Sequence, residues 1–117
     1  MNRALEVHPL AARTDVLIIN SHSGIPVRLT EERWNHIVCG HPEVLDCREE
    51  VLETLADPDM VQQGNFGELL AIREYRKLKP GRFTVVVYRE TCPDDGFVLT
   101  AYLTDRPSSR RRVIWKR

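Results

Sequence analysis

The chain has 117 residues, of which 42% are hydrophobic and 29% are charged. This length and composition predict a single globular domain over residues 1–117, with one core. No apolar run reaches the roughly 20 residues of a membrane span, and residues 1–14 lack a signal peptide's apolar centre. We therefore expect a cytoplasmic protein with no membrane partner. The three cysteines are an odd number and unevenly spaced, which argues against a disulfide framework.

The charges sum to zero but are unevenly distributed along the chain. Residues 1–72 carry 5 Lys or Arg and 12 Asp or Glu, whereas residues 73–117 carry 12 and 5, so the net charges are −7 and +7. This asymmetry is typical of a polarised surface whose basic part meets phosphate. It is equally typical of two halves that neutralise each other within one fold.

The first half of the chain predicts two short extended segments and then two helices. After a loose lead-in over residues 1–14, the extended segments are a buried strand or hydrophobic plug at 15–20 and a second piece at 27–29.

Thr30 is a good N-cap for a helix over residues 31–39, which Gly40 is expected to close in a left-handed conformation. A second, amphipathic helix is expected over residues 42–56, with Pro42 in its first turn.

The second half predicts an antiparallel meander. Strands are expected at residues 60–63, 69–78, 82–90 and 97–104, with a last edge strand at 112–115. Turns rich in Gly, Pro and Asp separate them. Helices followed by a meander predict an α+β domain.

Two histidines lie five residues apart where the two predicted helices meet. His41 continues the helical stripe of Trp34 and Ile37, so it is either a core or capping residue or a catalytic one. His36 lies off that stripe and is expected at the surface. Because imidazole exchanges protons near neutral pH, both are candidate general acids or bases.

Strand alternation divides residues 97–104 into two faces. Thr100, Tyr102 and Thr104 share one face with Val98. A row of hydroxyls can hold phosphate oxygens, although Thr and Tyr are also simply frequent in strands. The opposite face is expected to carry Phe97, Leu99, Ala101 and Leu103.

A zinc site made from His36, Cys39, His41 and Cys47 would have suitable ligand types. The segment has no CxxC pair, however, and Cys47 falls on the apolar face of the second helix. We therefore predict no metal and no other cofactor.

The C-terminal tail interleaves Arg110, Arg111 and Arg112 with Trp115. The arginines could bind RNA phosphates while the indole stacks on a base. Alternatively, this tail is an edge strand whose arginines protect it from aggregation.

Several short segments together resemble one known group of proteins. They are residues 29–37, 41–43, 54–59, 75–76, 85–87 and 100–102. In their order along residues 27–104, they resemble the phage- and mobile-element-associated nuclease-like families of the barnase–EndoU–colicin–RelE superfamily. The resemblance implies N-terminal helices packed on a roughly four-stranded antiparallel sheet. It also implies a metal-independent endoribonuclease that uses the RNA 2′-hydroxyl as its nucleophile.

The positions that match the resemblance are His36, His41, Thr100 and Tyr102. The preceding strand offers Arg76 to stabilise the transition state, with Arg73 and Lys77 as further RNA contacts. RNA is the implied partner, together with a possible cognate inhibitor protein. The alternative is a catalytically silent RNA- or protein-binding module of the same fold.

Overall fold

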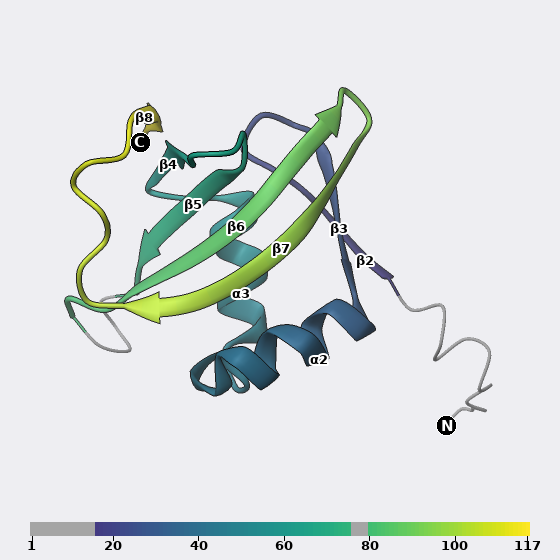
Figure 1. The fold of residues 1–117 in the computed structure, drawn as a ribbon, viewed down its shortest axis with the longest axis horizontal. Helices are drawn as coiled ribbons and strands as arrows, with labels where there is room; N and C mark the ends of the chain where they lie inside the picture. The colour runs from purple at the N-terminus through teal and green to yellow at the C-terminus, as the bar shows by residue number, and fades with distance from the viewer. Residues whose placement is uncertain (1–15, 76–79) are drawn as a thin grey trace.

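Seven strands in the described residues, 16–75 and 80–117, form one mixed β-sheet in the computed structural model (Figure 1). In chain order they are β2 (Val16–Asn20), β3 (Pro26–Thr30), β4 (Met60–Gln63), β5 (Leu69–Glu74), β6 (Phe83–Cys92), β7 (Asp95–Thr104) and β8 (Val113–Lys116). Across the sheet the order is β2-β3-β7-β6-β5-β4-β8. The pairings are antiparallel except that of β3 with β7, which is parallel through Arg28 and Phe97.

Two α-helices and one 3-10 turn lie between β3 and β4 along the chain. Helix α2 spans Glu31–Gly40, the 3-10 turn η1 spans Pro42–Val44 and helix α3 spans Arg48–Ala56. In Figure 1, α3 crosses behind the sheet and α2 runs below it. Neither helix is long and apolar enough to span a membrane, and the same holds throughout the described residues.

The expected arrangement of N-terminal helices on a four-stranded antiparallel sheet is wrong. The hairpin of β2 and β3 precedes the helices and extends the sheet by two strands, one of them parallel to β7. The segment predicted as a buried strand or plug is an edge strand, in which Ile18 is 60% exposed. Apolar composition favoured burial there, but it cannot show whether another layer covers the strand.

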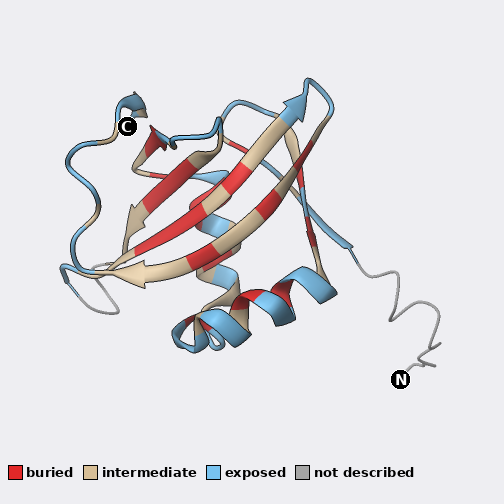
Figure 2. Cartoon of the chain, viewed as in Figure 1, coloured by how far each residue is buried: buried red, intermediate tan, exposed pale blue. Residues whose placement is uncertain are grey.

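The main core lies between the sheet and the two helices. Trp34 and Ile37 of α2 and Leu55 of α3 are buried against apolar residues of β3, β5, β6 and β7 (Figure 2). The helices are also tied to each other, because the Arg48 guanidinium lies 5.3 Å from the Trp34 ring and pairs with Glu31 at 2.9 Å. The predicted apolar stripes of both helices are therefore what attaches them to the sheet.

The end of α2 differs from the prediction. Thr30 caps its start as expected, since Thr30 Oγ1 accepts a hydrogen bond from Arg33 N at 3.0 Å. Gly40 belongs to the helix, however, and is not among the described glycines with positive φ. The helix ends when His41 N donates to Ile37 O at 2.7 Å. The expected helix at 42–56 is split into η1 and α3.

Two glycines form a matched pair for a stability test. A Cβ added at buried Gly96 would lie 2.5 Å from the carbonyl oxygen of Arg89, whereas one at Gly40 would meet nothing within 4 Å. Gly96→Ala is therefore expected to destabilise the fold by about 1–3 kcal/mol. Gly40→Ala is expected to stabilise it by up to about 1 kcal/mol, because alanine has the higher helix propensity. Urea unfolding measures both, and equal effects would contradict the close approach of the backbone at Gly96.

Charges from the two halves of the chain pair at one end of the sheet. Asp57 Oδ1 lies 2.7 Å from Arg117 Nη2, and Asp57 Oδ2 lies 3.1 Å from Arg73 Nη1. Arg117, the last residue, is thereby fixed beside the end of α3. Part of the opposite charge of the two halves is therefore neutralised within the fold.

This pairing predicts a pH dependence of stability. The hydrogen bond from Arg117, and then the charge of Arg117 and the contacts of Arg73, lower the pKa of Asp57 below its ordinary 3.8. Ionised Asp57 therefore stabilises the folded state above pH 3.8, and this contribution is lost as pH falls through the lowered pKa. Asp57→Asn should cost no more than about 1 kcal/mol near neutral pH, since the pair is exposed. The difference in unfolding free energy should shrink in acid; a constant difference would contradict this assignment.

Candidate functional site

A β-bulge in β7 decides which side chains share the face opposite the helices, here called the open face. Tyr88 pairs with Val98 but Val87 pairs with Thr100, so Leu99 is an extra residue in β7. The expected strict alternation is therefore wrong at this point. Val98 lies in the helix-side core, and the side chains that share the open face are Thr100, Tyr102 and Thr104, opposite Val87, Val85 and Phe83.

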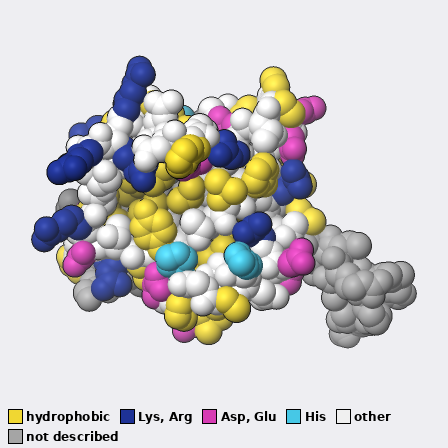
Figure 3. Space-filling view, viewed as in Figure 1, with side chains coloured by type: hydrophobic (Ala, Val, Ile, Leu, Met, Phe, Trp, Pro, Cys, Tyr) yellow, Lys and Arg dark blue, Asp and Glu magenta, His cyan; other side chains and the backbone are white. Residues whose placement is uncertain are grey.

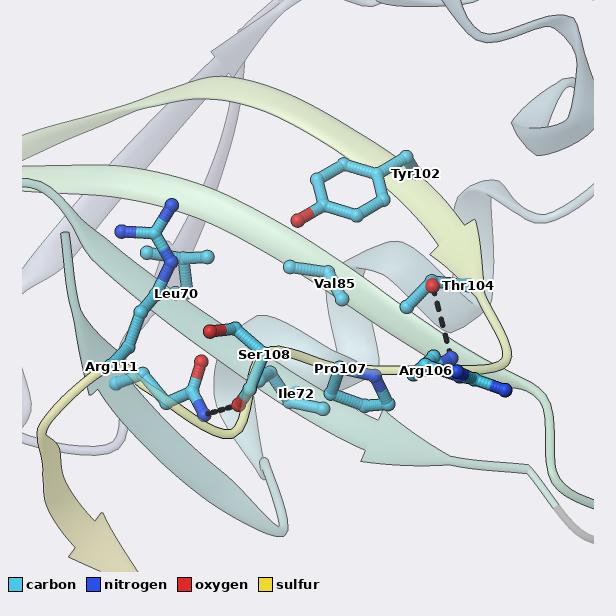
Figure 4. Close-up of a pocket in the computed structure, with 10 residues that line it drawn as sticks. Leu70, Ile72, Val85, Tyr102, Thr104, Arg106, Pro107, Ser108 and Arg111 are labelled. Atoms are coloured by element: carbon cyan, nitrogen blue, oxygen red, sulfur yellow. Dashed lines mark hydrogen bonds between the residues drawn. The ribbon is translucent and has the colours of Figure 1, made fainter.

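The open face has a small apolar cluster of its own, formed by Leu70, Ile72 and Val85 with Tyr102 packed against it. A pocket of about 270 Å³ lies over this cluster. Figure 4 shows Tyr102 and Arg111 on different sides of the pocket, with Val85 between them in the view. The remaining lining residues are Gln62, Thr104, Arg106, Pro107 and Ser108.

The segment from residue 105 to residue 112 forms one wall of this pocket. Gln62 Nε2 donates to Ser108 O at 2.8 Å, and Gln63 N donates to Arg112 O at 2.9 Å. At its start, Arg106 N donates to Thr104 Oγ1 at 3.1 Å. These bonds hold a polar loop against the sheet, so Gln62, Arg106 and Ser108 join the site although the sequence did not predict them. The strand β4 carries two adjacent glutamines, Gln62 and Gln63, and nothing in the sequence indicated that one of them would be buried at a pocket.

His41 lies beside this pocket, between α2 and η1. Its ring centroid is 5.6 Å from that of Tyr102, with an interplanar angle of 32°. Its Nδ1 is 3.4 Å from Glu43 Oε2, and the same carboxylate oxygen accepts a hydrogen bond from Leu103 N at 3.5 Å. Glu43 therefore connects His41 to β7 and holds the ring with its Nδ1 toward the carboxylate.

His36 lies in a different place. It is exposed and lines a separate hollow of about 360 Å³ with Thr30, Glu32 and Arg33. Figure 3 shows histidine side chains on the face that carries the apolar patch of the sheet, along its lower border. The two histidines predicted as a pair therefore do not line the same pocket.

The predicted basic residues of the preceding strand are not brought to the pocket. Arg73 pairs with Thr84, which in turn pairs with Leu103 on β7. The Arg73 guanidinium contacts Asp57 and Glu53 on the helix side. It therefore lies on the face opposite Tyr102. Arg76 and Lys77 lie outside the described residues.

Of the three tail arginines, Arg111 lines the pocket, while Arg110 and Arg112 are exposed beside it. Lys and Arg side chains gather at the left of Figure 3, where Figure 1 shows the chain running from β7 to β8. Trp115 is packed on the fold: its ring centroid is 4.9 Å from that of His22 in the turn after β2. The indole thus joins the two far ends of the sheet and is only partly accessible.

The residues weighed as zinc ligands do not assemble. Within residues 16–75 and 80–117, no three His, Cys, Asp or Glu side chains are placed to hold a metal ion. Burial, with Glu50 and Asp46 nearby, raises the pKa of the Cys47 thiol. That shift disfavours the thiolate form that zinc needs.

The arrangement at the pocket supplies three kinds of group that phosphodiester chemistry uses: an imidazole, a phenol hydroxyl and a guanidinium. Comparison of the chain with protein families, curated proteins and solved structures finds no match. The function of the protein is therefore inferred from this geometry and from the sequence resemblance.

Proposed function

We propose that this protein is a metal-independent endoribonuclease whose active site is the pocket beside His41. The observation that carries this proposal is the contact of the His41 and Tyr102 rings at a pocket that Arg111 also lines. Imidazole, the side chain of His41, is the type that exchanges protons near neutral pH. The hydroxyl of Tyr102 can donate a hydrogen bond, and the guanidinium of Arg111 is a permanent cation.

In the proposed reaction, His41 Nε2 takes the proton of the RNA 2′-hydroxyl. Glu43, 3.4 Å from Nδ1, favours the tautomer whose proton is on Nδ1. The 2′-oxygen then forms a bond to phosphorus, the bond to the 5′-oxygen breaks, and the products are a 2′,3′-cyclic phosphate and a 5′-hydroxyl. Tyr102 supplies the proton for the leaving oxygen, and Arg111 stabilises the charge that develops on the phosphate.

The proposal is tested by incubating the purified protein with mixed cellular RNA in the presence of EDTA. Cleavage should persist in chelator, and the upstream fragments should end in a 2′,3′-cyclic phosphate. A folded protein that leaves transfer, messenger and ribosomal RNA uncut would argue against the enzyme.

The second candidate is a catalytically silent RNA- or protein-binding module. The separation of His36 from the pocket favours it, because only one of the two imidazoles is then at the pocket. Such a module would bind RNA or protein through its basic loop and leave RNA intact. The cognate inhibitor protein stays a prediction under either function.

The tail arginines give a prediction for RNA binding that does not depend on cleavage. Arg111→Ala should weaken binding and lower the slope of log affinity against log salt by about 0.7, the value for one phosphate contact on a single strand. Arg112→Ala is the matched control, since Arg112 is exposed and does not line the pocket. Fluorescence anisotropy with a short single-stranded RNA measures both slopes. Equal slopes for wild type and Arg111→Ala would place this arginine outside the RNA contact.

A further inference from the structure

One residue that lines the pocket has a buried polar atom with no hydrogen-bond partner among the described residues. Gln62 is only 2% exposed and lines the pocket beside Leu70 and Ile72. Its Nε2 donates to Ser108 O at 2.8 Å, whereas its Oε1 is buried and accepts no hydrogen bond from the described residues. Leaving a buried acceptor unpaired is costly, so a fold that retains one here is suited to a ligand that supplies the donor.

The orientation of the Gln62 amide is fixed by its neighbour. A backbone carbonyl oxygen only accepts hydrogen bonds, so the atom that contacts Ser108 O must be the amide nitrogen. The atom left over is the acceptor. The missing partner is therefore an N–H or O–H donor.

The rest of the pocket restricts what kind of molecule carries that donor. Its floor is formed by the apolar side chains of Leu70, Ile72 and Val85, and the Tyr102 ring packs against them. A sugar would leave most of its hydroxyls unpaired on such a floor. A flat heteroaromatic ring buries its faces there and presents N–H groups at its edge, and guanidinium groups at the rim suit the attached phosphate.

We propose that this pocket binds one unstacked nucleobase of the RNA, and that Gln62 Oε1 accepts a hydrogen bond from an N–H of that base. The inference rests on the proposed function and names the part of the substrate that the site recognises. Tyr102 links the two roles, because it lines the base pocket and contacts His41. Gln62 can bond the base only through Oε1, because its Nε2 already donates to Ser108 O. The bidentate pairing of glutamine with adenine, which needs both atoms, is therefore excluded.

The test uses the full chain and ligands that differ by one donor. Calorimetric titration first ranks the four ribonucleoside 5′-monophosphates. The tightest of them is then compared with its analogue in which the N–H donors of the base edge are removed or methylated. Wild type should bind the analogue at least about tenfold more weakly, the loss expected for one buried hydrogen bond.

Two variants and one control assign that loss to Gln62. Gln62→Met keeps the length of the side chain without an acceptor, and should bind the nucleotide and its analogue equally. Gln62→Glu keeps the acceptor but loses the donor to Ser108 O, and where it folds it should retain the discrimination. The comparison of nucleotide and analogue on wild type tests the inference even if both variants fail to fold. Gln63→Met is the matched control: Gln63 is the next residue of β4, is exposed and does not line the pocket. It should discriminate as wild type does.

The outcomes separate this inference from the proposed function. Equal binding of nucleotide and analogue by wild type would overturn the inference, and so would undiminished discrimination by folded Gln62→Met. If Gln62→Met cleaves RNA with the same base preference as wild type, the nuclease activity is supported and the base pocket is contradicted. If the protein distinguishes the nucleotide from its analogue through Gln62 but cuts no RNA, the base pocket is supported and the proposed nuclease activity is contradicted.

Discussion

Replacing His41 with alanine is expected to lower single-turnover RNA cleavage by at least about a hundredfold, the lower bound for general acid–base catalysis by one side chain. Tyr102→Phe keeps the ring contact with His41 and removes only the hydroxyl. The loss of this proton donor should lower the cleavage rate by about tenfold or more. RNA affinity should change little in both variants, since phosphate charge supplies most of the binding.

The matched control for His41 is His36→Ala. His36 has the same chemistry and lies on the same helix–turn segment, but it is exposed and lines a different hollow. Its substitution should leave the cleavage rate within a few fold of wild type. If His36→Ala lowered the cleavage rate as much as His41→Ala does, the acid–base pair would be the two histidines that the sequence predicted. Unfolding midpoints must accompany these rates, because His41→Ala also removes a ring that packs on Tyr102 and contacts Glu43.

Leu55→Ala in α3 is expected to destabilise the protein by about 2–5 kcal/mol. Leu55 is 1% exposed and belongs to the core between helices and sheet, so truncation leaves a cavity that close-packed neighbours fill only partly. The total stability of a domain is about 5–15 kcal/mol, so this one change removes a large part of it. Urea unfolding at constant temperature measures the difference.

Leu45→Ala makes the same chemical change where the side chain is 58% exposed. It should alter stability by no more than about 0.5 kcal/mol. Similar losses for the two leucines would contradict the placement of α3 against the sheet. A small loss at Leu55 with a large one at Leu45 would mean that the turn after η1, and not α3, packs on the core.

The candidate site was only partly predictable. His41, Tyr102 and Arg111 were named from their chemistry, and the fold brings all three to one pocket or its border. His36 was paired with His41 by its nearness in sequence, yet His36 lines a separate hollow and only His41 contacts Tyr102 at the pocket. Gln62 could not be found, because a glutamine gains meaning only when burial and one unpaired atom are known.

The amino-acid sequence by itself determined most of the local structure. The cap at Thr30, the apolar stripes of the helices and the alternating strands specify α2, α3 and the meander, because these signals act between residues close together in the chain. Only the tertiary structure decided that β3 lies parallel to β7, and that the 105–112 segment folds over the open face. These contacts join residues far apart in sequence, where each partner's pattern is compatible with several neighbours. The bulge at Leu99 belongs to the same class, since one extra residue changes the face of Val98 without leaving a local mark.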